Sequence, residues 1–333
     1  MATIKEVSEL AQVSQATVSR VINGHKRVSE ANRERVHKAM KELGYRPNSF
    51  AQALASNRSN SVGMVVTHIS GNFFGPMLHT VEETLRAQGV HLIAASGYDD
   101  LEKERDAVRF LLSRQVDALI LHTNALPDDE IIELKQQGTR VVVINRFIPE
   151  LAEDCIRLDN ELGGYLATKH LLDLGHKKVA HISGPLLYED ARDRFNGYRK
   201  ALDEHGVEFD PRLIVEGSFM EDRSMPVIEK LFKRDVEFSA VFCGNDNLAL
   251  QVYDWLSQNN YIPGDQYSVI GFDDMAFARH LRPRLSSIDF PIITMGKLAA
   301  EYALDKDSTR QRNSNLRLEP SLMARDSSAN RRC

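Results

Sequence analysis

The short run from Val13 to Gly24 carries polar side chains at a spacing suited to hydrogen bonding with a flat partner. A helix that begins just after a capping Ser14 would bury its apolar positions Val18, Val21 and Ile22. Its opposite face would hold short polar or small side chains and one long cation, namely Gln15, Ala16, Ser19, Arg20 and Asn23. An ordinary solvated face mixes Lys and Glu instead. The pattern therefore predicts a helix that presses one face against a hydrogen-bonding surface.

Two more predicted helices flank this run. Thr3 and Glu6 match a capping box that starts a helix at Ile4. This helix must end near Val13, because Ser14 caps the next helix. A third helix is predicted over residues 30–43, with Ser29 as its N-cap and Gly44 as the left-handed residue that ends it. Two short helices joined by so tight a turn are typical of a helix-turn-helix, with the third completing the core. An ordinary three-helix bundle is the alternative.

Charge is distributed unevenly along the chain. Residues 1–58 hold ten Lys and Arg against five Glu, whereas the whole chain has a net charge of −5. A basic head on an acidic body favours a polyanionic partner for the head, although chance clustering would look similar. In a DNA-binding helix-turn-helix, the second helix lies in the major groove. There Gln15 and Arg20 reach base edges and Ala16 meets a thymine methyl, while the free N–H groups at Thr3 suit a phosphate.

The segment from residue 47 to 60 separates this head from the rest. Pro47 ends the third helix, Asn48 can cap a new one, and Ala51 and Leu54 fall in a brief helix that is too short to be stable alone. One interpretation is a plain tether. The other is a hinge helix that folds only beside its copy on DNA, where Leu54 can open a base step from the minor groove.

The remaining residues alternate between apolar β-rich runs and helical periodicity. Such alternation predicts parallel, doubly wound sheets, and two successive series predict two similar lobes. The helix at 291–304 and the strand "NLRLEPSLMAR" are left over and are expected to return to the first and second lobes. The other expected helices cover residues 74–88, 101–114, 128–137, 161–174, 191–205, 225–233 and 247–258.

Polar and aromatic side chains follow several predicted strands, where ligands of parallel sheets bind. Asn, Asp and Arg together offer donors and acceptors for vicinal hydroxyls, and an aromatic face packs against a sugar ring. The alternatives are a core role for Phe73 or Phe74, a turn cap for Asp273 or Asp274, and a helix cap for Asp246. The candidates are Ser70, Asn72, Phe73, Phe74, Asn145, Arg146, Arg192, Arg194, Asn245, Asp246, Asp273 and Asp274.

Enzyme chemistry lacks sequence support. The chain contains no G-x-S-x-G, P-loop or G-x-G-x-x-G motif, and its eleven histidines include no H-E-x-x-H. His68, His122 and His181 are interpreted as strand-end or packing residues. Three widely spaced cysteines predict reduced thiols. With no apolar run of 18 residues and no secretory signal, we expect a cytoplasmic protein with no membrane span, no cofactor and no metal.

The first 55 residues resemble the headpiece and hinge of the lactose repressor / galactose repressor family of bacterial transcriptional regulators. The resemblance rests on V-S-x-x-T-V-S-R-V-x-N and G-Y-x-P-N-x-x-A-x-x-L, and it continues through "AVFCGNDNLAL" and "SVIGFDDMAFARHLRPRLSSI". "INRxxP", "LATxH" and "RPRLSSI" are most similar to the galactose repressor branch, from which Gln15 and "SGPLLYEDARDRFNGY" depart. The implied fold is an α-helical helix-turn-helix head joined by a hinge helix to an α/β two-lobed periplasmic-binding-protein-like body with parallel sheets.

The resemblance also implies domains, partners and sites. The domains would be a head at 1–46, a hinge at 47–60 and a body at 61–333, with a first lobe of 61–159 and 290–316 and a second of 160–289 and 317–333. The implied partners are double-stranded operator DNA, a galactose-like sugar or glycoside effector, and a second copy in a homodimer. The implied DNA-binding residues are Thr3, Ser14, Gln15, Ala16, Thr17, Ser19, Arg20, Asn23, His25, Asn48, Ala51 and Leu54, and the effector residues are Ser70, Phe73, Phe74, Asn145, Arg194, Phe219, Asn245 and Asp273.

The expected function is a sugar-responsive repressor of a carbohydrate-utilisation operon. A sugar-binding protein without a regulatory role, or a regulator that uses sugar as corepressor or activator, is the alternative.

Overall fold

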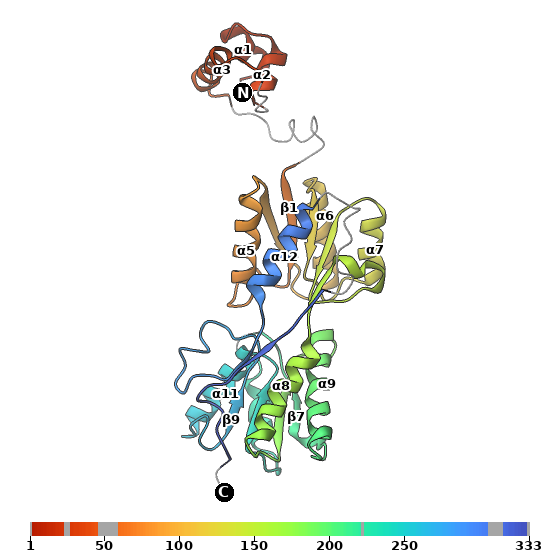
Figure 1. Ribbon diagram of the computed structural model, residues 1–333, viewed down its shortest axis with the longest axis vertical. Helices are drawn as coiled ribbons and strands as arrows, with labels where there is room; N and C mark the ends of the chain where they lie inside the picture. Colours follow the sequence, from red (N-terminus) through yellow and green to blue (C-terminus); the bar gives the residue numbers. More distant parts are fainter. Residues whose placement is uncertain (1, 23–26, 46–58, 221–222, 306–315, 332–333) are drawn as a thin grey trace. The chain divides into compact units, whose positions relative to one another are not determined.

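The computed structural model describes residues 2–22, 27–45, 59–220, 223–305 and 316–331. The chain divides into two compact units, Met1–Asn60 and Ser61–Cys333. Within the residues that the structure describes, no helix has both the length and the apolar character needed to cross a bilayer. We describe the two units in turn, as the headpiece and the body (Figure 1).

The headpiece contains three short helices, α1 (Ile4–Leu10), α2 (Gln15–Ile22) and α3 (Glu30–Glu42). Their buried stripes share one small core, made by Val7, Ala11, Val18, Val21, Val36 and Ala39. The capping box of α1 is present, and the Ser14 hydroxyl accepts a hydrogen bond from the N–H of Thr17 at 3.1 Å. Ser29 is the N-cap residue of α3, as predicted, but its side chain makes no capping hydrogen bond. Gly44 has the expected positive φ, +61°.

The first lobe of the body is built on a six-stranded parallel sheet in the order β11-β5-β4-β3-β1-β2. Helices α5 and α12 share apolar contacts with one face of this sheet, and α6 and α7 with the other. A 3-10 turn spans Pro149–Asp154. The elements are β1 (Ser61–Val66), α5 (Phe74–Arg86), β2 (His91–Ser96), α6 (Leu101–Ser113), β3 (Ala118–Leu121), α7 (Asp128–Gln136), β4 (Val141–Ile144), β5 (Cys155–Leu158), α12 (Ile292–Leu304) and β11 (Leu316–Leu318).

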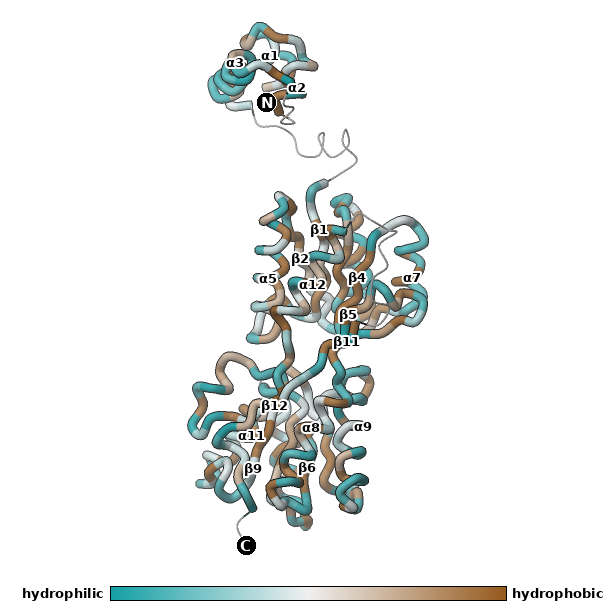
Figure 2. Tube along the Cα trace, in the orientation of Figure 1, coloured by the Kyte–Doolittle hydropathy of each residue, from teal (hydrophilic) through white to brown (hydrophobic). Residues whose placement is uncertain are grey.

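The second lobe repeats this architecture on a four-stranded parallel sheet in the order β7-β6-β8-β9. Helices α8 and α9 cover one face, and α10 and α11 cover the other. A second 3-10 turn spans Pro211–Leu213. The elements are α8 (Asn160–Asp173), β6 (Val179–Ser183), α9 (Glu189–Glu204), β7 (Ile214–Glu216), α10 (Met225–Phe232), β8 (Ala240–Cys243), α11 (Asp246–Gln258) and β9 (Ser268–Ile270). In Figure 2 the strands are brown within teal outer helix faces, as expected for buried sheets.

Three chain segments join the two lobes, from β5 to α8, from β10 (Ser287–Asp289) to α12, and from β11 to β12 (Ser321–Met323) (Figure 1). The predicted final strand is therefore two strands, since β11 pairs with β5 in the first lobe and β12 pairs antiparallel with β10. The expected lobe limit at residue 316 falls inside β11, which extends to Leu318. β5 and β10 have no counterpart among the predicted elements.

Candidate DNA-binding face and interlobe site

The second headpiece helix exposes the face that its spacing predicts. Gln15, Ala16 and Arg20 are exposed on α2, and Thr17 and Ser19 are half-buried, while Val18 and Val21 lie in the core. Ser14 is exposed, and its hydroxyl lies 2.9 Å from that of Thr17. The helix can approach a flat surface closely, since its exposed first turn carries short or small side chains.

The N-terminus of α1 differs from the expectation in one respect. The N–H of Thr3 donates to the Glu6 carboxylate at 2.7 Å, and the Thr3 hydroxyl also donates to it at 3.0 Å. A phosphate at this end would therefore meet the N–H groups of Ile4 and Lys5 instead. Five of the predicted DNA-binding residues, Asn23, His25, Asn48, Ala51 and Leu54, lie outside the described residues.

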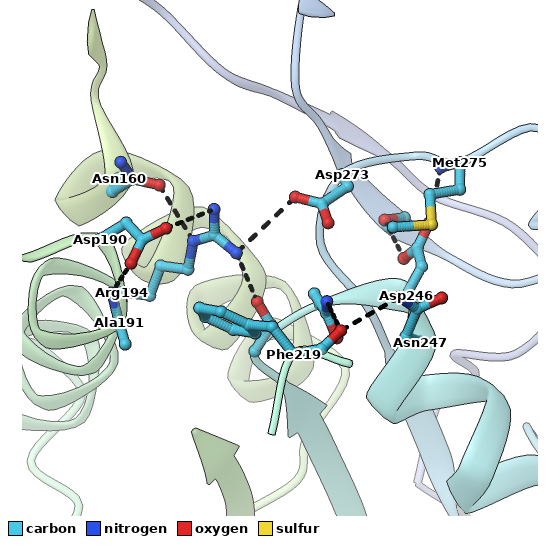
Figure 3. Close-up of polar contacts among 12 residues, drawn as sticks. Asn160, Asp190, Ala191, Arg194, Phe219, Asp246, Asn247, Asp273 and Met275 are labelled. Carbon is cyan, nitrogen blue, oxygen red and sulfur yellow. Dashed lines mark hydrogen bonds and ion pairs between the residues drawn. The ribbon is translucent and has the colours of Figure 1, made fainter. Parts of the chain in front are cut away.

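Arg194 is the central cation of the body, and two glycines position it. A Cβ on Gly164 of α8 would lie 2.1 Å from the Arg194 carbonyl oxygen, and one on Gly197 of α9 would lie 2.0 Å from that of Glu161. Only glycine permits so close a contact of the two helix backbones. The Arg194 side chain, 4% exposed, donates from Nη1 to the Gly244 carbonyl at 2.6 Å and from Nε to Asn160 at 2.9 Å (Figure 3).

Carboxylates flank this guanidinium on both sides in Figure 3. Asp273, in the loop after β9, lies 3.7 Å from Arg194 Nη1, and Asp190, one turn earlier on α9, lies 4.0 Å from Nη2. Burial and the Asp190 charge raise the pKa of Asp273 to about 7, although Arg194 opposes the shift. The Asp273 backbone has φ of +103°, which turns the chain sharply at the end of the strand. Asp274 instead forms an ion pair with Arg325 at 2.6 Å.

Asn245 and Phe219 complete the second-lobe side of the site. The Asn245 side chain caps α11 by accepting from the N–H of Leu248 at 3.0 Å, and it donates to the Phe219 carbonyl at 3.0 Å. Asp246 is therefore not the cap; its buried carboxylate accepts bonds from the Met275 N–H and the Ser287 hydroxyl. The Phe219 ring lies 5.3 Å from the Arg194 guanidinium (Figure 3).

The first lobe contributes groups that follow β4 and β3. Asn145, held at φ of +57°, donates from its side chain to Asp190 at 3.2 Å and accepts from Asn160 at 3.2 Å. The rings of Phe73 and Phe74 are half-buried, pack edge to face, and both contact His122. Ser70 is exposed. Both lobes thus bring side chains to one place, where they bond each other directly.

Several side chains at this place escaped the sequence analysis. Asp190 and Asn160 lie in the first turns of α9 and α8, and Tyr188 precedes α9, where burial and the Asp99 charge from the first lobe raise the pKa of Tyr188 to about 12. His122 and Thr123 follow β3 directly and are buried, with no hydrogen-bond partner for His122 Nδ1 or Thr123 Oγ1 in the described structure. The strand-end rule for ligand residues also covers these two positions, whereas the sequence analysis interprets His122 as a strand-end or packing residue and does not single out Thr123.

Two other residues predicted for the effector site make contacts elsewhere. Arg192 is exposed and donates to the carbonyls of Leu186 and Leu187, and Arg146 pairs with Asp128. Two cavities, of about 380 and 350 Å³, lie between α6 and α7 and beside α8 and α9, away from Arg194. In the described parts of the chain, no three His, Cys, Asp or Glu residues gather as metal ligands would.

The helix-turn-helix unit and the two-lobed body define a DNA-binding regulator with a small-molecule site, and comparisons with known proteins agree. The model "Periplasmic binding proteins and sugar binding domain of LacI family" matches residues 59–317, and "Bacterial regulatory proteins, lacI family" matches residues 3–48. The chain belongs to the LacI family of bacterial regulatory proteins. It is a DNA-binding transcriptional regulator and not an enzyme.

Named relatives and solved structures support this assignment. The chain is 41% identical to the HTH-type transcriptional regulator GalR of Escherichia coli strain K12, covering 91% of this chain and 89% of the relative. It is 35% identical to the ribose operon repressor of Haemophilus influenzae strain Rd, covering 98% of each. The lac repressor dimer bound to operator and the anti-inducer ONPF matches with a TM-score of 0.87 and 25% identity, covering 98% of this chain and 99% of that one. The predicted fold class and family are confirmed.

Proposed function

We propose that this chain represses a carbohydrate-utilisation operon in the cytoplasm, as a homodimer on a pseudo-palindromic operator in double-stranded DNA. A galactose-like sugar or glycoside would bind between the lobes and lower operator affinity. The observation that carries the proposal is the buried Arg194, flanked by Asp190 and Asp273, at the carboxyl ends of parallel strands. Such paired donors and acceptors suit vicinal hydroxyls, and relatives are named as the HTH-type transcriptional regulator GalR and as a ribose operon repressor.

On DNA, α2 would enter the major groove. Gln15 and Arg20 would contact base edges and Ala16 a thymine methyl, while Ser14, Thr17, Ser19 and the N-terminus of α1 would hold phosphates. Five further residues lie outside the described residues: Asn23 and Asn48 would contact the DNA backbone, Leu54 would enter the minor groove, and His25 and Ala51 would also bind DNA. The exposed cations Lys5, Arg27, Arg35, Lys38 and Lys41 would add affinity that does not depend on sequence.

In the body, the effector would contact Arg194, Asp273 and Asn245 from the second lobe and Asn145 from the first. Phe74 or Phe73, with Phe219, would pack against its ring, and Ser70 would lie at the edge. Because Asn145 bonds Asp190 across the lobes, an entering sugar must replace this bond. That exchange would shift the first lobe of each subunit in the homodimer, and with it the hinge segment. Sugar and operator would then favour different conformations of the dimer, so that sugar binding lowers operator affinity.

The test uses the full chain. Operator-like duplexes are selected from a random pool, and affinity is then measured by fluorescence anisotropy across a panel of monosaccharides and glycosides. We expect one duplex to bind far tighter than random DNA, and one sugar to weaken that binding at least tenfold. Asp273→Asn should lose the sugar effect, whereas Asp203→Asn, an exposed carboxylate at the far end of α9, should keep it. No preference for any duplex over random DNA, with or without sugars, would overturn the proposal.

A further inference from the structure

Carboxylates outnumber cations where the two lobes meet. Asp190 and Asp273 lie on either side of Arg194 (Figure 3), and the charge of Asp99, in the first lobe, acts on Tyr188 and His122. His122 adds no positive charge, because burial lowers its pKa. Among these described side chains, Arg194 is thus the one cation beside the carboxylates of Asp190 and Asp273, and the Asp99 carboxylate adds a further negative charge near His122.

Arg194 is held so that it does not satisfy Asp273. Its Nη1 donates to the Gly244 carbonyl at 2.6 Å and its Nε to Asn160 at 2.9 Å. The Phe272 ring, 3.7 Å from the guanidinium carbon, stacks against it. Asp273 Oδ1 is left 3.7 Å from Nη1, which is beyond hydrogen-bond length.

Asp273 therefore lacks a hydrogen-bond donor for one of its carboxylate oxygens. Its side chain is 6% exposed, and its Oδ1 accepts no hydrogen bond from any residue that the structure describes. A buried carboxylate without a donor is costly, so a proton or a positive charge beside it is favourable. Asp190 Oδ1 accepts from the N–H of Ala191 at 2.7 Å, whereas Oδ2 accepts a longer bond from Asn145 at 3.2 Å and lies 4.0 Å from Arg194.

The first lobe also contains buried polar atoms without hydrogen-bond partners. His122 Nδ1 and Thr123 Oγ1 are buried without hydrogen-bond partners in the described structure. His122 lies close enough to Asp190 and Asp99 for their charges to act on it. Unsatisfied polar atoms from both lobes indicate a ligand with several polar groups rather than an apolar one.

We propose that the natural effector is an amino sugar, with its protonated amine between the carboxylates of Asp190 and Asp273 and its hydroxyls on the remaining polar groups. An ammonium group brings three donors for the incompletely paired oxygens of Asp190 and Asp273, and a positive charge in addition to that of Arg194. Sugar phosphates and uronates are disfavoured, since they would add negative charge beside the carboxylates of Asp190 and Asp273. The inference rests on the proposed function and narrows its ligand class.

The test compares matched ligand pairs on the full chain at pH 7. Isothermal titration calorimetry is run with galactosamine against galactose, glucosamine against glucose, and N-acetylgalactosamine as the uncharged amide. We expect at least one free amine to bind tenfold or more tighter than its neutral parent and its amide. Asp190→Asn should remove most of that preference. Asp203→Asn, with the same charge change on the same helix but at an exposed site, should retain it.

Two contrary results differ in meaning. If neutral parents bind as tightly as the amines, and one of them weakens operator binding, the amino-sugar proposal is overturned and the proposed function stands. If no carbohydrate of any charge binds or alters operator affinity, while the operator itself is bound specifically, both fall.

Discussion

The side-chain amide of Asn145, in the first lobe, donates a hydrogen bond to the carboxylate of Asp190, in the second lobe, over 3.2 Å. The oxygen of the same amide accepts a bond from Asn160, also in the second lobe. One side chain thus ties the two lobes at the place where the effector is proposed to bind. This arrangement makes opening of the lobes depend on a few polar contacts, each worth roughly 1 kcal/mol.

Asn145→Ala should therefore loosen the joint between the lobes. We expect backbone amide hydrogen exchange to quicken several-fold in the connecting segments, residues 158–160, 289–292 and 318–321, because the variant lacks both cross-lobe bonds. Asn259→Ala is the control, since the Asn259 amide bonds only within the second lobe, to the Trp255 carbonyl at 2.8 Å. Exchange rates that match the native chain in all three segments would show that Asn145 does not hold the lobes together.

Arg20→Ala should reduce operator binding selectively. Arg20 is exposed and lies outside the headpiece core, so its removal should cost contacts with DNA rather than stability. We expect a tenfold to hundredfold loss for the selected operator, consistent with about 1–3 kcal/mol for a good base contact. Fluorescence anisotropy with operator and random duplexes measures this loss.

The matched control is Lys41→Ala, which removes an exposed cation from the last turn of α3. It should weaken both duplexes by a similar, smaller factor, because a phosphate contact carries no sequence information. If Arg20→Ala weakens binding to the operator and to the random duplex by the same factor, the base-contact role of Arg20 is wrong.

Much of the architecture was predictable because caps and periodicity are local signals. Thr3, Glu6 and Ser14 fixed the starts of α1 and α2, and the structure contains both caps. β5 escaped prediction since its four residues include Arg157 and its strand character comes from pairing with β4 and β11, which are distant in sequence. Similarly, β11 belongs to the first lobe because it pairs with β5, and β12 belongs to the second because it pairs with β10. No local sequence pattern encodes these pairings.

The site was less predictable, and Asp190 shows why. The sequence predicts that α9 begins at Ala191, but the helix begins at Glu189, after Tyr188, which makes no side-chain cap. Without a capping signal the first turn was missed, so Asp190 was not recognised as lying one turn from Arg194. Position at the start of a predicted helix also did not separate Arg194, which is buried, from Arg192, which is exposed.

Asp273→Asn should stabilise the body at alkaline pH. The pKa of Asp273 is raised from 3.8 to about 7 in the folded chain by burial and by Asp190, with Arg194 opposing. The folded state thus binds the proton more tightly than the unfolded state, so this group's contribution to stability is lost as pH rises from about 4 through 7. Above pH 7 the variant should be more stable than the native chain by up to about 4 kcal/mol, and near pH 4 the two should converge.

Thermal unfolding of both chains from pH 4 to 8.5 measures this difference. Asp203→Asn, which changes an exposed carboxylate, should give a difference close to zero throughout. A native chain that matches or exceeds the Asp273→Asn variant in stability at pH 8 would contradict the assigned pKa shift.

Gly164→Ala should disrupt the contact that positions Arg194. The new methyl group would lie 2.1 Å from the Arg194 carbonyl oxygen, so α8 and α9 must separate. We expect the free energy of unfolding to fall by about 1–3 kcal/mol, as in overpacked cores, and effector affinity to fall with it because the guanidinium moves. Urea unfolding followed by fluorescence of Trp255, the chain's one tryptophan, reports the first effect.

Gly75→Ala is the matched control, since Gly75 is also helical but has no atom within 4 Å of the added Cβ. That variant should be neutral or up to about 1 kcal/mol more stable, through the better helix propensity of alanine. Equal effects of the two substitutions would mean that the close approach of α8 and α9 does not position Arg194.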